Sequence, residues 1–312
     1  MGSLIDTRPT RREILAAGTA TAVLGSVAEA RPVLWTKRGR AMRFAHLTDV
    51  HVQPERGAGE GMAACLRHVQ SQKDAPEFIV FGGDNVMSVD SEDGRARADV
   101  QLDLWRRVLK SECSLPHASA IGNHDVFGNH PVDGKQWAVD AYELPGRCYT
   151  LDRAGWRFVF LDSTFPEGDG YVGKLDDGQF EWLADVLRRT KPETPVCVVS
   201  HIPILAVCTY LCIEDPPTAD WQIPGSWVHI DAHRIKNLFK RYPNVRLCLS
   251  GHMHMVDAID YLGVTYACNG AVSGNWWKGT YHEFDPKYAL VDLYKDGTCR
   301  VELVNYGWEP RA

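Results

Sequence analysis

After residue 40, short apolar runs alternate with amphipathic stretches, and this alternation limits the possible folds more than any other feature of the chain. Six apolar runs are predicted to form strands: Arg43–Leu47, Phe78–Phe81, Ala118–Ile121, Trp156–Leu161, Val196–Ser200 and Val245–Leu249. Four stretches between them have helical periodicity: roughly Gly61–Gln72, Arg95–Lys110, Asp177–Arg189 and Asp231–Arg241. Strands that alternate with helices favour an α/β layered fold.

The end of the chain has a different pattern, because its apolar segments follow one another without a helix between them. These segments are Val256–Tyr261, Val264–Cys268, Ala289–Tyr294 and Cys299–Val304. We expect antiparallel strands here, and we expect them to form a second sheet that packs on the first. Residues 202–230 contain Pro and Trp but little periodicity, which is typical of a functional loop.

The composition allows one large core and argues against a nucleic-acid-binding protein. The chain has 312 residues, of which 45% are hydrophobic, and we expect a single folded domain after the N-terminal segment. The net charge is -6, whereas proteins that bind nucleic acid normally carry a basic stripe. We therefore expect no nucleic-acid partner.

Polar side chains that can bind metals follow the predicted strands, at the positions where α/β proteins build their sites. Each alone has an ordinary explanation as a helix cap or a turn residue. Together they supply two carboxylates, one amide oxygen and four imidazoles, with one histidine and one aspartate left over. This set suits two metal ions, with one carboxylate bridging them, better than one ion. The nine residues are Asp49, His51, Asp84, Asn123, His124, Asp125, His201, His252 and His254.

These motifs, read in order as D-x-H, G-D, G-N-H-D, a single His after a strand and G-H-x-H, resemble the calcineurin-like metallophosphoesterase family. The resemblance covers residues 43 to about 270, and the segment GAVSGNWWKG at 270–279 also resembles a segment of bacterial members. It implies an α/β fold in which a two-sheet β-sandwich is flanked by helices, the αββα arrangement. It also implies a metal-dependent phosphoric ester hydrolase.

The resemblance further implies which residues bind two divalent or trivalent transition-metal ions. One ion would be bound by Asp49, His51 and His254, the other by Asn123, His201 and His252, and both by Asp84. Manganese, iron and zinc all accept this set of ligands, so the sequence does not identify the metal. Met87 stands where purple acid phosphatases have a tyrosine ligand, so we expect no iron-tyrosinate centre.

The implied reaction is hydrolysis of a small phosphate monoester or diester by a hydroxide that bridges the two ions. His124, which has no ligand role, is the predicted general acid, and Asp125 is predicted to orient its ring. His130, Trp276 and Trp277 are predicted to lie at the substrate rim. Two alternatives stay open, a cyclic-nucleotide phosphodiesterase and a catalytically silent binding module on the same scaffold; the complete ligand set disfavours the second.

The first thirty residues differ from the rest of the chain. Arg11-Arg12 precedes a run of small and apolar residues from Ile14 to Ala28, and Ala28-Glu29-Ala30 fits a signal-peptidase site. The segment TRREILAAG resembles a twin-arginine export signal. A helical or disordered N-terminal arm is the alternative interpretation. The run is too short and too rich in Ala, Gly and Thr to form a stable membrane anchor.

We therefore predict three parts: a signal peptide at 1–30, a linker at 31–40 and a metallophosphoesterase domain at 41–312. The twin-arginine machinery would then be a partner, and the bacterial enzyme would be periplasmic or otherwise extracytoplasmic. Without the signal it would be cytoplasmic. The chain has nine cysteines and no C-x-x-C pair, so a structural zinc cluster is not expected. Whether Cys208 and Cys212 form a disulfide is left open.

Overall fold

The computed structural model describes residues 39–90, 94–127, 133–213 and 220–310. The chain divides into the units Met1–Pro32 and Val33–Ala312, and all of the described residues belong to the second. The predicted signal peptide, and most of the predicted linker, therefore lie outside the described residues. None of the described helices is long and apolar enough to span a membrane.

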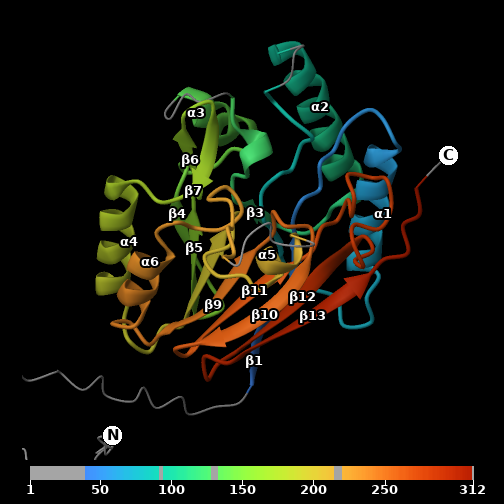
Figure 1. Ribbon diagram of the computed structural model, residues 1–312. Helices are drawn as coiled ribbons and strands as arrows, with labels where there is room; N and C mark the ends of the chain where they lie inside the picture. The colour runs from blue at the N-terminus through green and yellow to red at the C-terminus, as the bar shows by residue number, and fades with distance from the viewer. Residues whose placement is uncertain (1–38, 91–93, 128–132, 214–219, 311–312) are drawn as a thin grey trace, which may run out of the picture. The chain divides into compact units, whose positions relative to one another are not determined.

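Two β-sheets lie face to face at the centre of the second unit (Figure 1). The five-stranded sheet has the order β13-β12-β1-β2-β3, formed by Cys299–Asn305, Lys287–Tyr294, Arg40–Leu47, Ile79–Phe81 and His117–Ser119. The six-stranded sheet has the order β10-β11-β9-β8-β5-β4, formed by Val256–Tyr261, Val264–Asn269, Val245–Ser250, Val196–Ser200, Trp156–Leu161 and Tyr149–Arg153. A separate hairpin consists of β6, Thr164–Glu167, and β7, Gly170–Gly173.

Helices cover the outer face of each sheet, and apolar side chains fill each of the layers between them. The helices α1, Ala58–Gln70, and α2, Gly94–Glu112, pack on the five-stranded sheet. The helices α4, Asp177–Arg189, and α6, Ala232–Phe239, pack on the six-stranded sheet. Between the sheets lie buried side chains such as Phe44, Phe158 and Leu249. The predicted α/β sandwich with flanking helices is confirmed.

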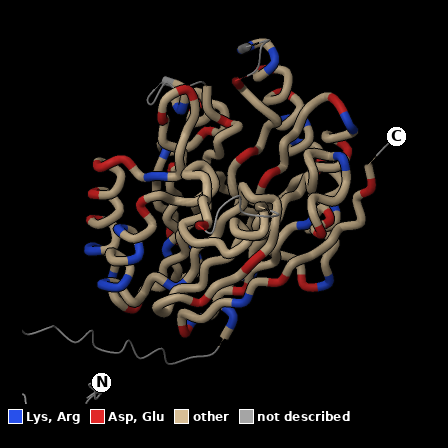
Figure 2. Tube along the Cα trace, viewed as in Figure 1, with Lys and Arg blue, Asp and Glu red and all other residues tan. Residues whose placement is uncertain are grey.

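Two further helices and a turn complete the described elements: α3 at Asp133–Ala141, α5 at Cys208–Leu211 and the 3-10 turn η1 at Asn123–Asp125. Acidic and basic residues are interspersed over the outer helices and loops of the described part (Figure 2). All nine cysteines are free thiols, and the Cys212 sulfur lies 3.1 Å from the Met255 sulfur.

The prediction that the C-terminal strands form a sheet of their own is wrong. The strands β10 and β11 extend the six-stranded sheet through a parallel pairing of β11 with β9. The strands β12 and β13 extend the other sheet, because β12 pairs with β1. Alternating apolar residues identify a strand but not its neighbour, since any open strand edge offers the same backbone groups.

Parallel pairing explains how the fold gathers the polar residues. The strands β1, β2 and β3 are parallel neighbours, and so are β5, β8 and β9. The carboxyl ends of parallel neighbours meet at one edge of a sheet, which is where α/β proteins build their sites. Backbone hydrogen bonds join neighbouring loops within each sheet there, from Asp49 to Gly83 in one sheet and from Gly251 to His201 in the other.

Candidate metal centre

The loops that follow β1, β2, β3, β8 and β9 bring the predicted ligands together. Asp49, His51 and His254 form what we call the first ligand group, whose ligand atoms lie within 4.8 Å of one another. Asp84, His201 and His252 form the second ligand group under the same limit. The two groups are joined by a third set that meets the same limit, made of His51, Asp84 and His124.

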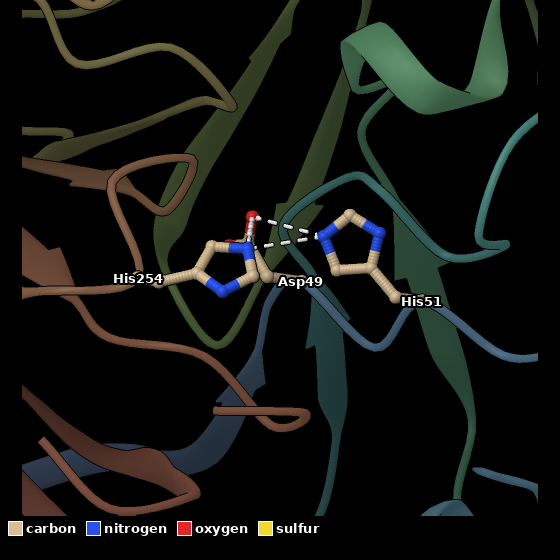
Figure 3. A group of neighbouring side chains, drawn as sticks. All are labelled: Asp49, His51 and His254. Carbon is tan, nitrogen blue, oxygen red and sulfur yellow. Dashed lines mark hydrogen bonds and ion pairs between the residues drawn. The ribbon is translucent and has the colours of Figure 1, made fainter. Parts of the chain in front are cut away.

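The first ligand group is a tight triangle of donor atoms (Figure 3). His51 Nε2 lies 3.1 Å from His254 Nε2. Asp49 Oδ1 lies 3.8 Å from His51 Nε2 and 3.3 Å from His254 Nε2. All three side chains are buried.

The second ligand group is equally close and includes the predicted amide ligand beside it. His201 Nε2 lies 3.2 Å from Asp84 Oδ2 and 3.1 Å from Asn123 Oδ1. His51 Nε2 lies 3.6 Å from Asp84 Oδ2, so this carboxylate faces both groups. The structure therefore brings all seven predicted ligands into one cluster of nitrogen and oxygen donors, a set that fits two transition-metal ions.

The backbone of the ligand loops adopts a conformation that L-residues rarely use. Five of the seven predicted ligands have a positive φ: Asp49, His51, Asp84, His252 and His254, at 55°, 47°, 51°, 68° and 55°. Each such residue costs about 1–3 kcal/mol, and such residues concentrate at functional sites. Strain of this kind, repeated over three separate loops, supports a functional role for the cluster without reference to any motif.

Two glycines allow the ligand loops to approach each other. A Cβ atom at Gly122 would lie 2.1 Å from Asp84 Oδ1, and one at Gly251 would lie 2.1 Å from Asp49 Oδ2. These are the first residues of the G-N-H-D and G-H-x-H motifs. A side chain at Gly122 would displace the carboxylate of Asp84, and one at Gly251 would displace the carboxylate of Asp49.

Backbone carbonyls fix which ring nitrogen of three histidines faces the cluster. His201 Nδ1 donates to the Gly82 carbonyl at 2.9 Å, and His252 Nε2 donates to the Ser226 carbonyl at 2.9 Å. His254 Nδ1 contacts the Gly274 carbonyl. Because a carbonyl only accepts, the hydrogen lies on these nitrogens, and the other nitrogen of each ring faces the cluster, where it can bind a metal ion when it carries no proton.

Comparison with known proteins decides the family. The model of the calcineurin-like phosphoesterase family matches residues 42–256, which is more than half of the chain. The chain belongs to the calcineurin-like phosphoesterase family. It is a metal-dependent hydrolase of phosphate esters, as predicted. Members of the family typically bind two metal ions, in agreement with the two ligand groups.

Individual relatives agree with this assignment. The chain is 24% identical over 277 residues to a 3′,5′-cyclic-nucleotide phosphodiesterase of Nostoc sp., covering 84% of this chain and 92% of the relative. It is 24% identical over 232 residues to a probable cyclic nucleotide phosphodiesterase of Synechococcus sp., covering 68% and 74%. A dimetal phosphatase from Danio rerio has the same fold, with a TM-score of 0.59 and 15% identity, covering 84% of this chain and 99% of that one.

The charges of this calcineurin-like phosphoesterase prepare the cluster for a cation. Burial alone would lower the pKa of His201, but the carboxylates of Asp84 and Asp49 outweigh it and raise the pKa to about 9. Burial, and then the charge of His201, lower the pKa of His252 to about 4. Burial acts to raise the pKa of Asp84, but His201 and other imidazoles hold it well below its usual value. Two buried carboxylates are therefore anionic, which favours cation binding.

His124 lies at the open side of the cluster, but Asp125 does not orient its ring as predicted. The His124 Nδ1 atom contacts the Met87 carbonyl, while Nε2 lies 3.9 Å from Asp84 Oδ2. Asp125 is buried and accepts hydrogen bonds from the backbone of Gly122 at 2.9 Å and from the Tyr142 hydroxyl at 2.7 Å. Neighbouring residues of a helical turn point in different directions, which explains the difference.

The predicted substrate rim is only partly correct. Trp277 is 1% exposed, and its indole nitrogen donates to the His51 carbonyl at 3.0 Å, so it belongs to the core and not to the rim. Trp276 is partly exposed, and its ring centroid lies 4.4 Å from that of His254. Positive φ angles of 47° and 69° turn the two neighbouring indoles to different sides. The predicted His130 lies outside the described residues.

Two features of the site carried no signal in the sequence. Tyr281 packs against both His254 and Trp276, with ring centroids 5.7 and 5.5 Å away. The Ser226 carbonyl, from the irregular segment before α6, reaches His252. A backbone carbonyl has the same chemistry in every residue, so no motif could identify it.

Proposed function

We propose that this phosphoesterase hydrolyses small phosphate diesters, and that 3′,5′-cyclic nucleotides are its substrate class. The observation that carries the catalytic part is that a third set of close side chains, His51, Asp84 and His124, joins the two ligand groups. The preference for cyclic diesters is supported by the two relatives named as cyclic-nucleotide phosphodiesterases. Hydrolysis of phosphate monoesters is the second candidate within the same chemistry.

The first ligand group, Asp49, His51 and His254, is proposed to hold one ion. The second ligand group is proposed to hold the other together with Asn123, and Asp84 would supply a carboxylate to both. The ions are proposed to be divalent or trivalent manganese, iron or zinc, all of which accept these donors. When bound, such a pair supplies an activated water and positive charge for the phosphate oxygens.

His124 is the proposed general acid. Its Nδ1 contacts the Met87 carbonyl and so carries the hydrogen, which leaves Nε2 as the atom that exchanges a proton. This side chain is 27% exposed, whereas Asp84 beside it is 2% exposed, so Nε2 is near the ligands and reachable by substrate. In its protonated state His124 donates to the oxygen that leaves the phosphorus.

A substrate panel tests the proposal. Manganese-loaded protein is assayed on cyclic AMP, bis-p-nitrophenyl phosphate and p-nitrophenyl phosphate, with His252→Ala and an exposed-site control, Asp177→Ala, assayed in parallel. We expect cyclic AMP and the diester to be hydrolysed faster than the monoester, and His252→Ala to be impaired. Preference for the monoester would establish the second candidate. Hydrolysis of none of the three by metal-loaded protein would favour the silent binding module.

We also propose that residues 1–30 direct export through the twin-arginine machinery and that the mature bacterial enzyme is extracytoplasmic. The support is the Arg11-Arg12 pair, the apolar run and the A-x-A site. Cell fractionation of the full chain and of an R11K/R12K variant tests this. We expect the wild-type protein in the periplasm without residues 1–30 and the variant in the cytoplasm. Wild-type protein found entirely in the cytoplasm would contradict export.

A further inference from the structure

Beside the second ligand group, two buried side chains and one partly buried aspartate form a continuous hydrogen-bonded chain. His229 Nδ1 lies 2.8 Å from Asp231 Oδ1, and His229 Nε2 lies 3.2 Å from Ser200 Oγ. Ser200 and His229 are 1% and 3% exposed. Serine, histidine and aspartate in this order are also the residues of a nucleophilic triad, so the two roles must be distinguished.

The hydrogen bonds of Ser200 exclude the role of nucleophile. Its hydroxyl donates to the Ile202 carbonyl at 2.8 Å, so its proton is not directed to His229. The oxygen instead accepts from His229 Nε2, and because Nδ1 donates to the Asp231 carboxylate, the ring carries a hydrogen on both nitrogens. A nucleophilic serine must also reach its substrate, whereas Ser200 is buried at the end of β8. The hydrogen bonds among Ser200, His229 and Asp231 therefore have a structural role, which is to link two segments of the chain.

What His229 holds is the segment that precedes α6. Its backbone nitrogen donates to the Pro203 carbonyl at 2.9 Å, and the backbone nitrogen of Ile230 donates to the Gly173 carbonyl at 2.8 Å. Asp231 Oδ2 accepts from the Leu175 backbone nitrogen at 3.0 Å. The side chain of His229 thus fastens this irregular segment to β8.

The hydrogen-bonded chain and the segment that it fastens reach the second ligand group at two points. Ser226, three residues before His229, supplies the carbonyl that accepts from His252 Nε2. Ser200, at the other end of the hydrogen-bonded chain, directly precedes His201. In the first ligand group, the corresponding carbonyl for His254 comes from Gly274, in a different loop. Among the described residues, the segment that His229 fastens therefore hydrogen-bonds to a ligand of the second group and to none of the first.

We propose that His229 is a positioning residue that selectively strengthens metal binding by the second ligand group. The inference rests on the proposed function of both groups as metal sites. Fixing the Ser226 carbonyl keeps His252 in the tautomer and orientation that present its lone pair to the ion. Hydrogen-bonding partners behind a ligand typically contribute about 10–100-fold to metal affinity.

The test is a calorimetric titration of metal-free protein with Mn²⁺, for wild type and His229→Phe. Phenylalanine keeps the ring and removes both hydrogen bonds. We expect two binding events in wild type. In His229→Phe we expect one of them to weaken by about tenfold or more, and the other to stay within about twofold. His229→Gln, which can still donate to Ser200 Oγ, should restore part of the lost affinity.

Two further variants identify the affected group. His252→Ala removes a ligand of the second group, so adding His229→Phe to it should weaken the remaining event no further. Tyr149→Phe is the matched control, because it removes a buried hydroxyl that bonds Ser119 and contacts neither ligand group. It should leave both binding events unchanged. If His229→Phe does not fold, as judged by near-ultraviolet circular dichroism, Asp231→Ala, which removes the acceptor of His229 Nδ1, takes its place with the same expectation.

The outcomes separate the inference from the proposed function. If wild type binds two ions and His229→Phe binds both with unchanged affinity, the positioning role is overturned and the proposed function stands. Equal weakening of both events would also overturn it, because a general structural role would act on both groups. Absence of metal binding by wild type would overturn the proposed function itself.

Discussion

The two ligand groups contain the same kinds of donor atoms but are supported by different parts of the fold. In the first group, the Trp277 indole donates to the His51 carbonyl, and Gly274, in the loop of that indole, contacts His254. In the second group, His252 depends on a carbonyl of the irregular segment before α6. Trp277 is among the largest fully buried side chains, whereas Ser226 is only partly buried. Identical donor chemistry therefore does not imply equal affinity, and we expect the first group to hold its ion more tightly.

The strongest way to break the comparison is to remove Asp84, the carboxylate that faces both groups. Asp84→Ala should remove both ions and reduce kcat/KM by at least about 10³-fold, because both the activated water and the charge on the phosphate are lost. Metal content and hydrolysis of bis-p-nitrophenyl phosphate measure this. Asp177→Ala, at an exposed carboxylate, is the control. Near-normal activity in Asp84→Ala would contradict the shared role.

Replacing His124 should separate catalysis from metal binding in both groups. We expect His124→Asn to lower kcat about 10²–10⁴-fold on cyclic AMP, whose leaving oxygen needs a proton, with unchanged metal content. The loss should be smaller on bis-p-nitrophenyl phosphate, because p-nitrophenolate leaves without protonation. Equal losses on the two substrates would argue against a general acid.

Removing one ligand from each group should show which group binds its metal ion more tightly. After dialysis against a dilute chelator, His252→Ala should retain the ion of the first group, whereas His254→Ala should retain less metal. The expected difference between the remaining dissociation constants is about tenfold, from the weaker support of the second group. Metal analysis of both variants measures it, and the reverse order would contradict the ranking.

The smallest expected effect concerns the rim above the first group. Trp276→Ala should raise KM for cyclic AMP about tenfold by loss of aromatic stacking, which is worth about 1–3 kcal/mol per base. It should have little effect on bis-p-nitrophenyl phosphate hydrolysis. Trp221→Ala, at a 49% exposed indole that packs on Tyr210, is the matched control. An equal change of KM for both substrates would show that Trp276 does not contact the base.

The sequence predicted the position of site residues correctly where that position follows directly from the order of the strands along the chain. Polar residues after parallel strands lie at one edge of a sheet, so the order of strands along the chain was enough to place Asp49 near Asp84. The resemblance to the family added His201, which follows a strand of the other sheet.

The sequence failed where backbone conformation or the choice of neighbour decided the outcome. Trp276 and Trp277 are identical in type and adjacent, and only their positive φ angles separate rim from core. The η1 turn directs Asp125 away from the His124 ring, and the pairing of β12 with β1 depended on which sheet edge was open. None of these choices leaves a pattern in composition or periodicity.

The central claim, that two ions bound by these seven residues catalyse ester hydrolysis, is tested most directly by a stepwise titration. Metal-free wild-type protein receives Mn²⁺ in fractions of an equivalent, and hydrolysis of bis-p-nitrophenyl phosphate is measured at each ratio. We predict almost no activity until the first ion is bound, and a rise to full activity as the ratio goes from one to two. Full activity at one ion per chain, or activity without added metal, would contradict the account.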